Sequence, residues 1–166
     1  MSMNAVGIDV SKGKSMVAIL RPYGEIVSKP FEVKHTVSGI RSLIKQIQSI
    51  DGESRIVMEH TGRYYEPLVR ELSQANLFVS AVNPKLIKDF SDNSLRKVKS
   101  DRADALKIVR YTLDSWTELR QYSLMDEIRN QLKTMNRQFD FWFKSLRGKG
   151  IFQSVKNWNG KCLQNQ

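Results

Sequence analysis

The chain has 166 residues, 40% of them hydrophobic, which allows one folded domain plus an extension and argues against general disorder. A single cysteine, Cys162, excludes an internal disulfide, and with two separated histidines it excludes a zinc site. No apolar run could span a membrane and the first residues do not form a signal peptide, so we expect a cytoplasmic protein with no membrane partner.

The net charge of +10 is concentrated in two parts of the chain. Residues 85–110 carry 8 basic and 4 acidic side chains, and residues 129–166 carry 8 and 1. Residues 1–84 are nearly balanced, with 10 and 8. Clustered positive charge favours nucleic acid as the partner over charge that serves only solubility.

The first third of the chain predicts three strands in an antiparallel meander, at residues 5–10, 15–21 and 25–33. A helical period then predicts alternating helices and strands. These are a helix over 37–50, a strand over 55–59, a helix from Pro67 to Asn76, a strand over 77–82, a short helix to about Phe90 and a longer helix from Asp101 to about Leu113.

The predicted order is β-β-β-α-β-α-β-α, which is typical of an α/β fold with a mixed sheet and helices on its faces. It is the order of the ribonuclease H-like (RuvC-like) fold, although other mixed α/β folds share parts of it. We expect this domain to occupy residues 1–115, followed by a helical extension over 116–147 and a weakly structured basic tail over 148–166.

The extension has apolar residues three and four apart, as in a heptad seam. They are Met125, Ile128, Leu132, Met135, Phe139, Trp142 and Leu146. A coiled coil between chains and an amphipathic helix packed on its own domain both fit this pattern.

Two carboxylates end predicted strands. Asp9 lies inside the apolar run of residues 6–10, where a charge is costly unless it is paired or binds a cation. Gly7 lies on the same strand face, which predicts open space beside Asp9. Glu59 closes the apolar run of residues 56–58. For each acid the alternative is a structural role at a strand end, capping a turn or facing solvent.

Asp101 and Asp104 are three residues apart at the start of the last helix of the domain, so they share one helical face. The helix N-terminus favours acids in its first turn, and helix capping is therefore the alternative function of Asp101. It explains Asp104 less well.

Acids from three separate elements could converge on Mg²⁺ or Mn²⁺, which prefer oxygen ligands and leave room for a substrate phosphate. The basic residues around the helix start would then hold the phosphate backbone. They are Lys97, Lys99, Arg102 and Lys107.

Four stretches resemble one known family. They are Val6-Gly7-Ile8-Asp9-Val10-Ser11-Lys12, Met58-Glu59-His60-Thr61-Gly62-Arg63-Tyr64, Val82-Asn83-Pro84, and Lys97-Val98-Lys99-Ser100-Asp101-Arg102-Ala103-Asp104-Ala105. In order and spacing they are similar to the N-terminal domain of DEDD transposases of insertion-sequence family one hundred and ten, which includes the Piv-type invertases. The similarity covers residues 4 to 115.

The resemblance implies a RuvC-like domain whose catalytic and metal-binding residues are Asp9, Glu59, Asp101 and Asp104. It assigns supporting, structural positions to Thr61, Gly62, Asn83 and Pro84. It also implies action on DNA in transposition, recognition of a guide RNA, and homo-oligomer assembly through the helical extension.

Members of this family continue into a second domain that supplies a serine nucleophile, whereas this sequence ends at Gln166. We therefore expect a C-terminally truncated transposase that is inactive alone. The alternatives are a stand-alone metal-dependent nuclease or resolvase, and a non-enzymatic fragment that assembles with full-length transposase.

Overall fold

A computed structural model describes residues 2–60, 63–91 and 100–148. The chain divides into two compact units, residues 1–122 and residues 123–166. In the described ranges, no helix combines the length and the apolar character needed to cross a membrane.

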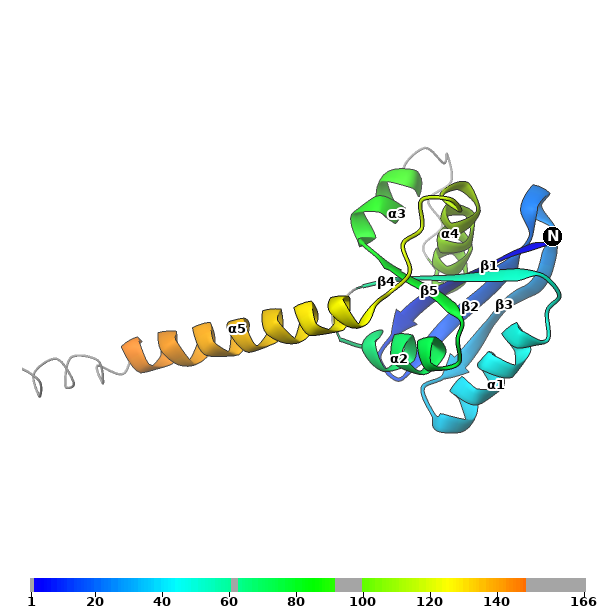
Figure 1. The fold of residues 1–166 in the computed structure, drawn as a ribbon. Helices are drawn as coiled ribbons and strands as arrows, with labels where there is room; N and C mark the ends of the chain where they lie inside the picture. The colour runs from blue at the N-terminus through cyan, green and yellow to red at the C-terminus, as the bar shows by residue number, and fades with distance from the viewer. Residues whose placement is uncertain (1, 61–62, 92–99, 149–166) are drawn as a thin grey trace, which may run out of the picture. The chain divides into compact units, whose positions relative to one another are not determined.

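Within its described residues, the first unit contains five strands and four α-helices in the predicted order, with two helices after the last strand (Figure 1). The strands are β1 (Met3–Ser11), β2 (Lys14–Leu20), β3 (Ile26–Lys34), β4 (Glu53–Glu59) and β5 (Phe78–Val82). The helices are α1 (Val37–Gln48), α2 (Glu66–Gln74), α3 (Pro84–Ser91) and α4 (Asp101–Asp114), with a short 3-10 turn, η1 (Pro22–Gly24), before β3. The second unit contains α5 (Leu124–Gly148).

The strands form one mixed sheet in the order β3-β2-β1-β4-β5. The first three strands are an antiparallel meander, and β4 and β5 run parallel to β1. This arrangement follows from the sequence, because tight turns join the first strands whereas helices cross between the later ones. The predicted α/β mixed-sheet fold is confirmed.

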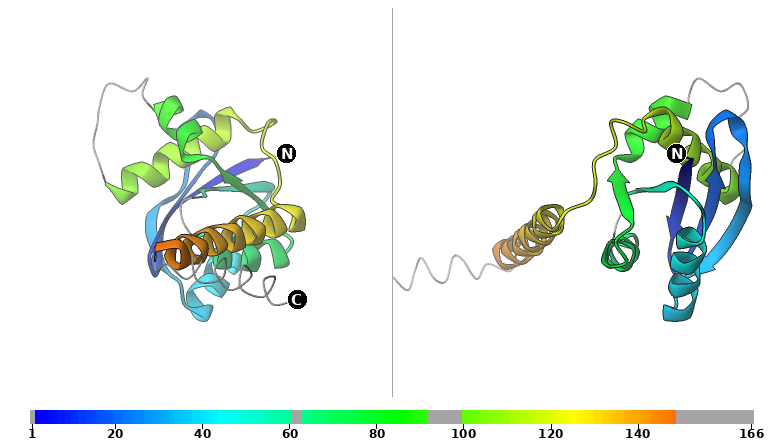
Figure 2. Two further views of the ribbon diagram at one scale, coloured as in Figure 1. Left: turned by 90° about the vertical axis from the view of Figure 1, so that its left-hand side faces the viewer. Right: turned by 45° about the vertical axis from the view of Figure 1, so that its right-hand side comes forward.

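Helices cover both faces of the sheet, as Figure 1 and Figure 2 show. Helices α1 and α2 pack on one face, where Ile8, Leu43 and Leu68 belong to the largest apolar cluster. Helices α3 and α4 cover the other face in two smaller clusters, through Ile87, Ala105 and other apolar residues. Because side chains alternate along a strand, odd-numbered residues of β1 and β4 face α4.

Helix α4 lies directly against β1 at Gly7. A β-carbon at this position would lie 2.5 Å from the backbone nitrogen of Val109 and 2.6 Å from the carbonyl oxygen of Ala105. Only a residue without a side chain permits this approach. The predicted open space beside Asp9 is therefore wrong at Gly7, because the backbone of α4 fills that position.

The far end of α4 is held by Arg55 of β4. The Arg55 guanidinium lies 4.7 Å from the ring centroids of both Phe78 and Trp116, and it donates a hydrogen bond to the Trp116 carbonyl oxygen. Such stacking contributes about 0.5–2 kcal/mol per ring, depending on solvent exposure. Helix α4 is thus fixed both at its middle and just beyond its end.

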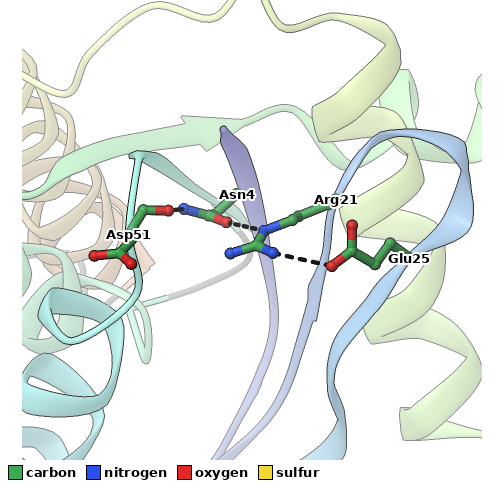
Figure 3. Close-up of polar contacts among 4 residues, drawn as sticks. All are labelled: Asn4, Arg21, Glu25 and Asp51. Carbon is green, nitrogen blue, oxygen red and sulfur yellow. Dashed lines mark hydrogen bonds and ion pairs between the residues drawn. The ribbon is translucent and has the colours of Figure 1, made fainter. Parts of the chain in front are cut away.

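A polar network holds the first residues of β1 (Figure 3). The fully buried Asn4 side chain donates to the Asp51 carbonyl oxygen at 3.0 Å and accepts from Nε of Arg21 at 2.9 Å. Arg21 also pairs with Glu25 at 2.9 Å. The network connects β1 to the turns on both of its sides, which fixes the alignment of the strand that carries Asp9.

Candidate functional site

Asp9 and Glu59 lie next to each other on the sheet. Strands β1 and β4 pair in parallel, and the last pair in register is Ile8 with Met58. Asp9 and Glu59 follow this pair on their strands, so both side chains point to the face that α4 covers. Both residues are half-buried. The sequence order placed them 50 residues apart, and the parallel pairing brings them together.

The other two predicted acids begin α4. Ser100 is the N-cap, because its hydroxyl accepts from the backbone N–H of Ala103 at 3.2 Å. Asp101 and Asp104 occupy the first turn and are exposed and half-buried, respectively. The side-chain cap is therefore provided by Ser100. Asp101 lies in the first turn, where the helix N-terminus favours an acid, so its structural alternative stays open.

The four acids interact electrostatically at Asp9. The pKa of Asp9 is raised to about 6, first by burial and then by the negative charges of Asp104, Asp101 and Glu59, in that order of effect. Carboxylates that repel one another in a half-buried place favour either protonation or a cation. The raised pKa agrees with the backbone geometry, in which β4 pairs with β1 and the acid-bearing helix α4 lies against β1 at Gly7.

The chemistry of these residues fits a hard divalent cation, because all four offer carboxylate oxygens. Among the residues that the structure describes, however, no three acidic, histidine or cysteine side chains are arranged to hold a metal ion together. The site is accordingly a set of acids within electrostatic reach of one another rather than a formed coordination sphere.

Of the four basic residues predicted to contact phosphate, the structure describes Arg102 and Lys107, and their surroundings differ. Nζ of Lys107 lies 2.8 Å from Oδ1 of Asp104, one helical turn away, so this lysine is paired with a predicted metal ligand. Arg102 is exposed on the first turn of α4. Lys97 and Lys99 lie outside the described residues.

Of the four supporting positions that the resemblance assigned, the structure describes Asn83 and Pro84. Thr61 and Gly62 lie outside the described residues. The Asn83 side chain accepts from the backbone N–H of Lys85 at 2.9 Å, and α3 begins at Pro84. Asn83 and Pro84 therefore start a helix directly after β5, which is a structural role.

Lys14 and Glu32 were missed from the sequence. They form an ion pair of 2.7 Å between β2 and β3, on the sheet face that carries Asp9. Alternation along the predicted strands could have placed them on one face, but their pairing depends on the register between strands.

The fold resembles that of solved RuvC structures. The Thermus thermophilus RuvC structure matches with a TM-score of 0.52 and 13% sequence identity, covering 70% of this chain and 95% of that one. T. thermophilus RuvC in complex with Holliday junction substrate matches with a TM-score of 0.52 and 12% identity, covering 70% and 96%. At this identity the similarity defines the fold class alone, which is RuvC-like.

The family is defined by sequence. A model of the DEDD transposases of IS110 type, described as "Transposase", matches residues 6–146. This match covers most of the chain, and the chain belongs to that family. A search of curated proteins finds no match.

Proposed function

We propose that this chain acts on DNA in transposition, with Asp9, Glu59, Asp101 and Asp104 as the residues that bind divalent metal. One observation carries the proposal. Asp9 and Glu59 follow the last paired residues of β1 and β4, and α4, which begins with Asp101 and Asp104, lies against β1 at Gly7 in a chain of a transposase family. The raised pKa of Asp9 agrees with this placement. Membership in the family and the gathering of these acids support the same assignment.

The acids would hold Mg²⁺ or Mn²⁺ through hard oxygen ligands. When bound, such an ion supplies a Lewis acid that polarises a phosphoryl group and stabilises charge on the attacking and leaving oxygens. Glu59 and Asp9 are fixed by paired strands, whereas Asp101 and Asp104 are carried by α4. The position of α4 on β1 thereby sets the separation between the two halves of the site.

DNA is the proposed substrate, and we place the activity in the cytoplasm. One of the structures with a similar fold is RuvC in complex with a Holliday junction substrate, and the net charge of this chain is +10. Basic residues near the acids, including Arg102, would contact the phosphate backbone. Recognition of a guide RNA stays a prediction from the resemblance.

We further propose that residues 1–115 form the DNA-acting domain and residues 116–147 an extension that assembles chains. The seam residues of α5 whose side chains are described are 38–65% exposed. They are Ile128, Leu132, Met135, Phe139, Trp142 and Leu146. A row of apolar side chains at heptad spacing on one helix is typical of a surface that pairs with another helix.

A structure-selective nuclease is the second candidate, because the fold resembles RuvC. Both candidates need metal and DNA, but they differ in whether the chain cleaves on its own. Metal-dependent cutting of four-way junctions that is lost in Asp9→Asn would favour the nuclease over a transposase part that is inactive alone.

Metal-dependent DNA binding tests the proposed function. Fluorescence anisotropy measures binding of linear and four-way DNA with Mg²⁺, with Mn²⁺ and with EDTA, for wild type, Asp104→Asn and Asp114→Asn. Asp114 is an exposed acid at the other end of α4, so it matches Asp104 in charge and helix. We expect metal to strengthen binding by wild type and Asp114→Asn but not by Asp104→Asn. If wild type binds DNA equally well with Mg²⁺, with Mn²⁺ and with EDTA, the proposal is contradicted.

A further inference from the structure

A second basic group lies on β2 and β3, on the sheet face that α4 covers. Lys14 and Lys34 are cross-strand partners at the ends of these strands, and Glu32 lies two residues before Lys34 on the same face. Nζ of Lys14 is 2.7 Å from Oε2 of Glu32. Lys14, Glu32 and Lys34 are called the strand-end cluster below.

The strand-end cluster adjoins the four acids. Asp9 is opposite Met16 on β2, and Met16 is opposite Glu32 on β3, so Asp9 and Glu32 share one row across three strands. Lys14 and Lys34 occupy the next row on this face. Asp101 contributes a small share to the raised pKa of Lys14, after the larger effects of Glu32. The lysines are thus placed beside the site by register and not only by sequence.

The backbone beneath the strand-end cluster is fixed. The backbone N–H of His35 donates to the Gly13 carbonyl oxygen at 2.9 Å, which ties the end of β3 to the β1–β2 turn. On the opposite face, Oγ of the buried Ser15 is 2.7 Å from Nε2 of His35. Two strand ends held in this way present their lysines with little backbone freedom, which lowers the entropy cost of binding.

The ion pair with Glu32 leaves Lys14 available. The Lys14 and Glu32 side chains are 48% and 41% exposed. Exposed pairs of this kind contribute little, because water solvates both charges, whereas a phosphate contact in low salt also releases counterions. A phosphate oxygen can therefore replace the Glu32 carboxylate as the partner of Lys14, and Lys34 adds a second charge next to it.

We propose that the strand-end cluster binds the phosphate backbone of the DNA on which the four acids act, through Lys14 and Lys34. This inference rests on the proposed function. It adds a contact on the sheet to those predicted around α4, so that the DNA backbone is held from two different elements. Glu32 is a positioning residue in this account, because it orients Lys14 when DNA is absent.

The test compares two double variants that lose the same charge. Lys14→Gln/Lys34→Gln removes the proposed contacts, and Lys29→Gln/Lys45→Gln removes two exposed lysines from β3 and α1. DNA affinity is measured against NaCl concentration with Mg²⁺ present, and thermal melting checks that each variant is folded. We expect the slope of log affinity against log salt to fall by roughly 1.8 in the first variant, because each lost phosphate contact reduces it by about 0.9.

The variant Glu32→Gln should change DNA affinity in the opposite direction from Lys14→Gln/Lys34→Gln. Removal of the competing carboxylate should strengthen DNA binding by roughly two- to fivefold at low salt, because the exposed pair with Lys14 is weak and its loss leaves Lys14 to the phosphate. The inference is overturned if both double variants bind DNA alike, or if Glu32→Gln binds no better than wild type. If wild type shows metal-dependent binding in these cases, the proposed function stands and only the inference fails. If wild type binds no DNA, both fail.

Discussion

Asp9 is held in a position that opposes its ionisation. Its pKa of about 6 lies above the ordinary value of 3.8, because the carboxyl is half-buried and faces three other acids. In the unfolded chain this carboxyl is solvated and loses its proton near its ordinary pKa. The folded protein therefore binds more protons than the unfolded chain between these two values.

This difference predicts a specific pH dependence of stability in metal-free protein. The contribution of Asp9 is favourable near pH 4 and is lost as the pH rises through about 6. Asp9→Asn should therefore be more stable than wild type at pH 7 in EDTA, by roughly 1–2 kcal/mol after allowance for solvent screening. Urea unfolding at pH 4 and pH 7 measures this. Equal stability of the two proteins at pH 7 would contradict the placement of Asp9 among like charges.

Gly7 has a second role at the residue scale, since it allows α4 to carry its acids close to Asp9. Gly7→Ala should destabilise the fold by about 1–3 kcal/mol through overpacking and move α4 away from β1. The pKa of Asp9 should then fall toward its ordinary value, because its carboxyl becomes better solvated and lies farther from Asp104 and Asp101. The Asp9 pKa is measured by NMR titration of the carboxyl carbon.

Gly39 provides a matched control for this prediction. A β-carbon at Gly39 would also clash with backbone, at the Lys34 carbonyl oxygen, but Gly39 lies on α1, which packs on the sheet face opposite α4. Gly39→Ala should lose stability while the Asp9 pKa stays near 6. An Asp9 pKa that is unchanged in Gly7→Ala would show that the close approach at Gly7 does not set the geometry of the site.

At the scale of elements, the strands of the site could be predicted better than its helix. Asp9 lies inside one apolar run and Glu59 closes another, and parallel pairing of their strands follows from the helical crossover between them. The sequence also predicted a helix from Asp101, but it did not reveal where the helix would lie. The backbone contact at Gly7 and the clamp on Trp116 depend on tertiary packing, which the local pattern does not contain.

The partners of charged residues were the least predictable part. The sequence did not reveal that Lys107 pairs with Asp104 or that Ser100 is the N-cap of α4, and the predicted phosphate contact of Lys107 stays a prediction. The Lys14–Glu32 pair joins residues 18 apart whose contact depends on strand register. A shift of one residue would place these side chains on opposite faces.

Helix α5 yields a prediction about assembly. Phe139 lies on the heptad seam and is 64% exposed, whereas Phe141 lies off the seam and is 68% exposed. If the seam pairs with a second chain, Phe139→Ser should weaken self-association, because it removes an apolar side chain from the core of the helix pair. Phe141→Ser should leave it unchanged. Sedimentation equilibrium over a range of concentrations measures the difference, and equal behaviour of the two variants would exclude the seam as the interface.

At the scale of the whole molecule, one domain of RuvC-like fold carries acids and bases on the same face of its sheet. The acids come from β1, β4 and α4, and the strand-end cluster comes from β2 and β3. A single mixed sheet can unite them because its central strand, β1, has neighbours of both orientations. The arrangement would bring the DNA backbone and a divalent cation to one place, as phosphoryl transfer requires.

Divalent metal affinity of the free protein tests the central claim most directly. Mn²⁺ binding is followed by electron paramagnetic resonance, which detects the ion left free in solution, for wild type, Asp9→Asn, Asp104→Asn and Asp114→Asn. We predict that Asp9→Asn and Asp104→Asn each weaken Mn²⁺ binding by about tenfold or more, equivalent to about 1.4 kcal/mol. Asp114→Asn should match wild type. If Asp9→Asn and Asp104→Asn bind Mn²⁺ as tightly as wild type, the assignment of the four acids as a metal site is contradicted.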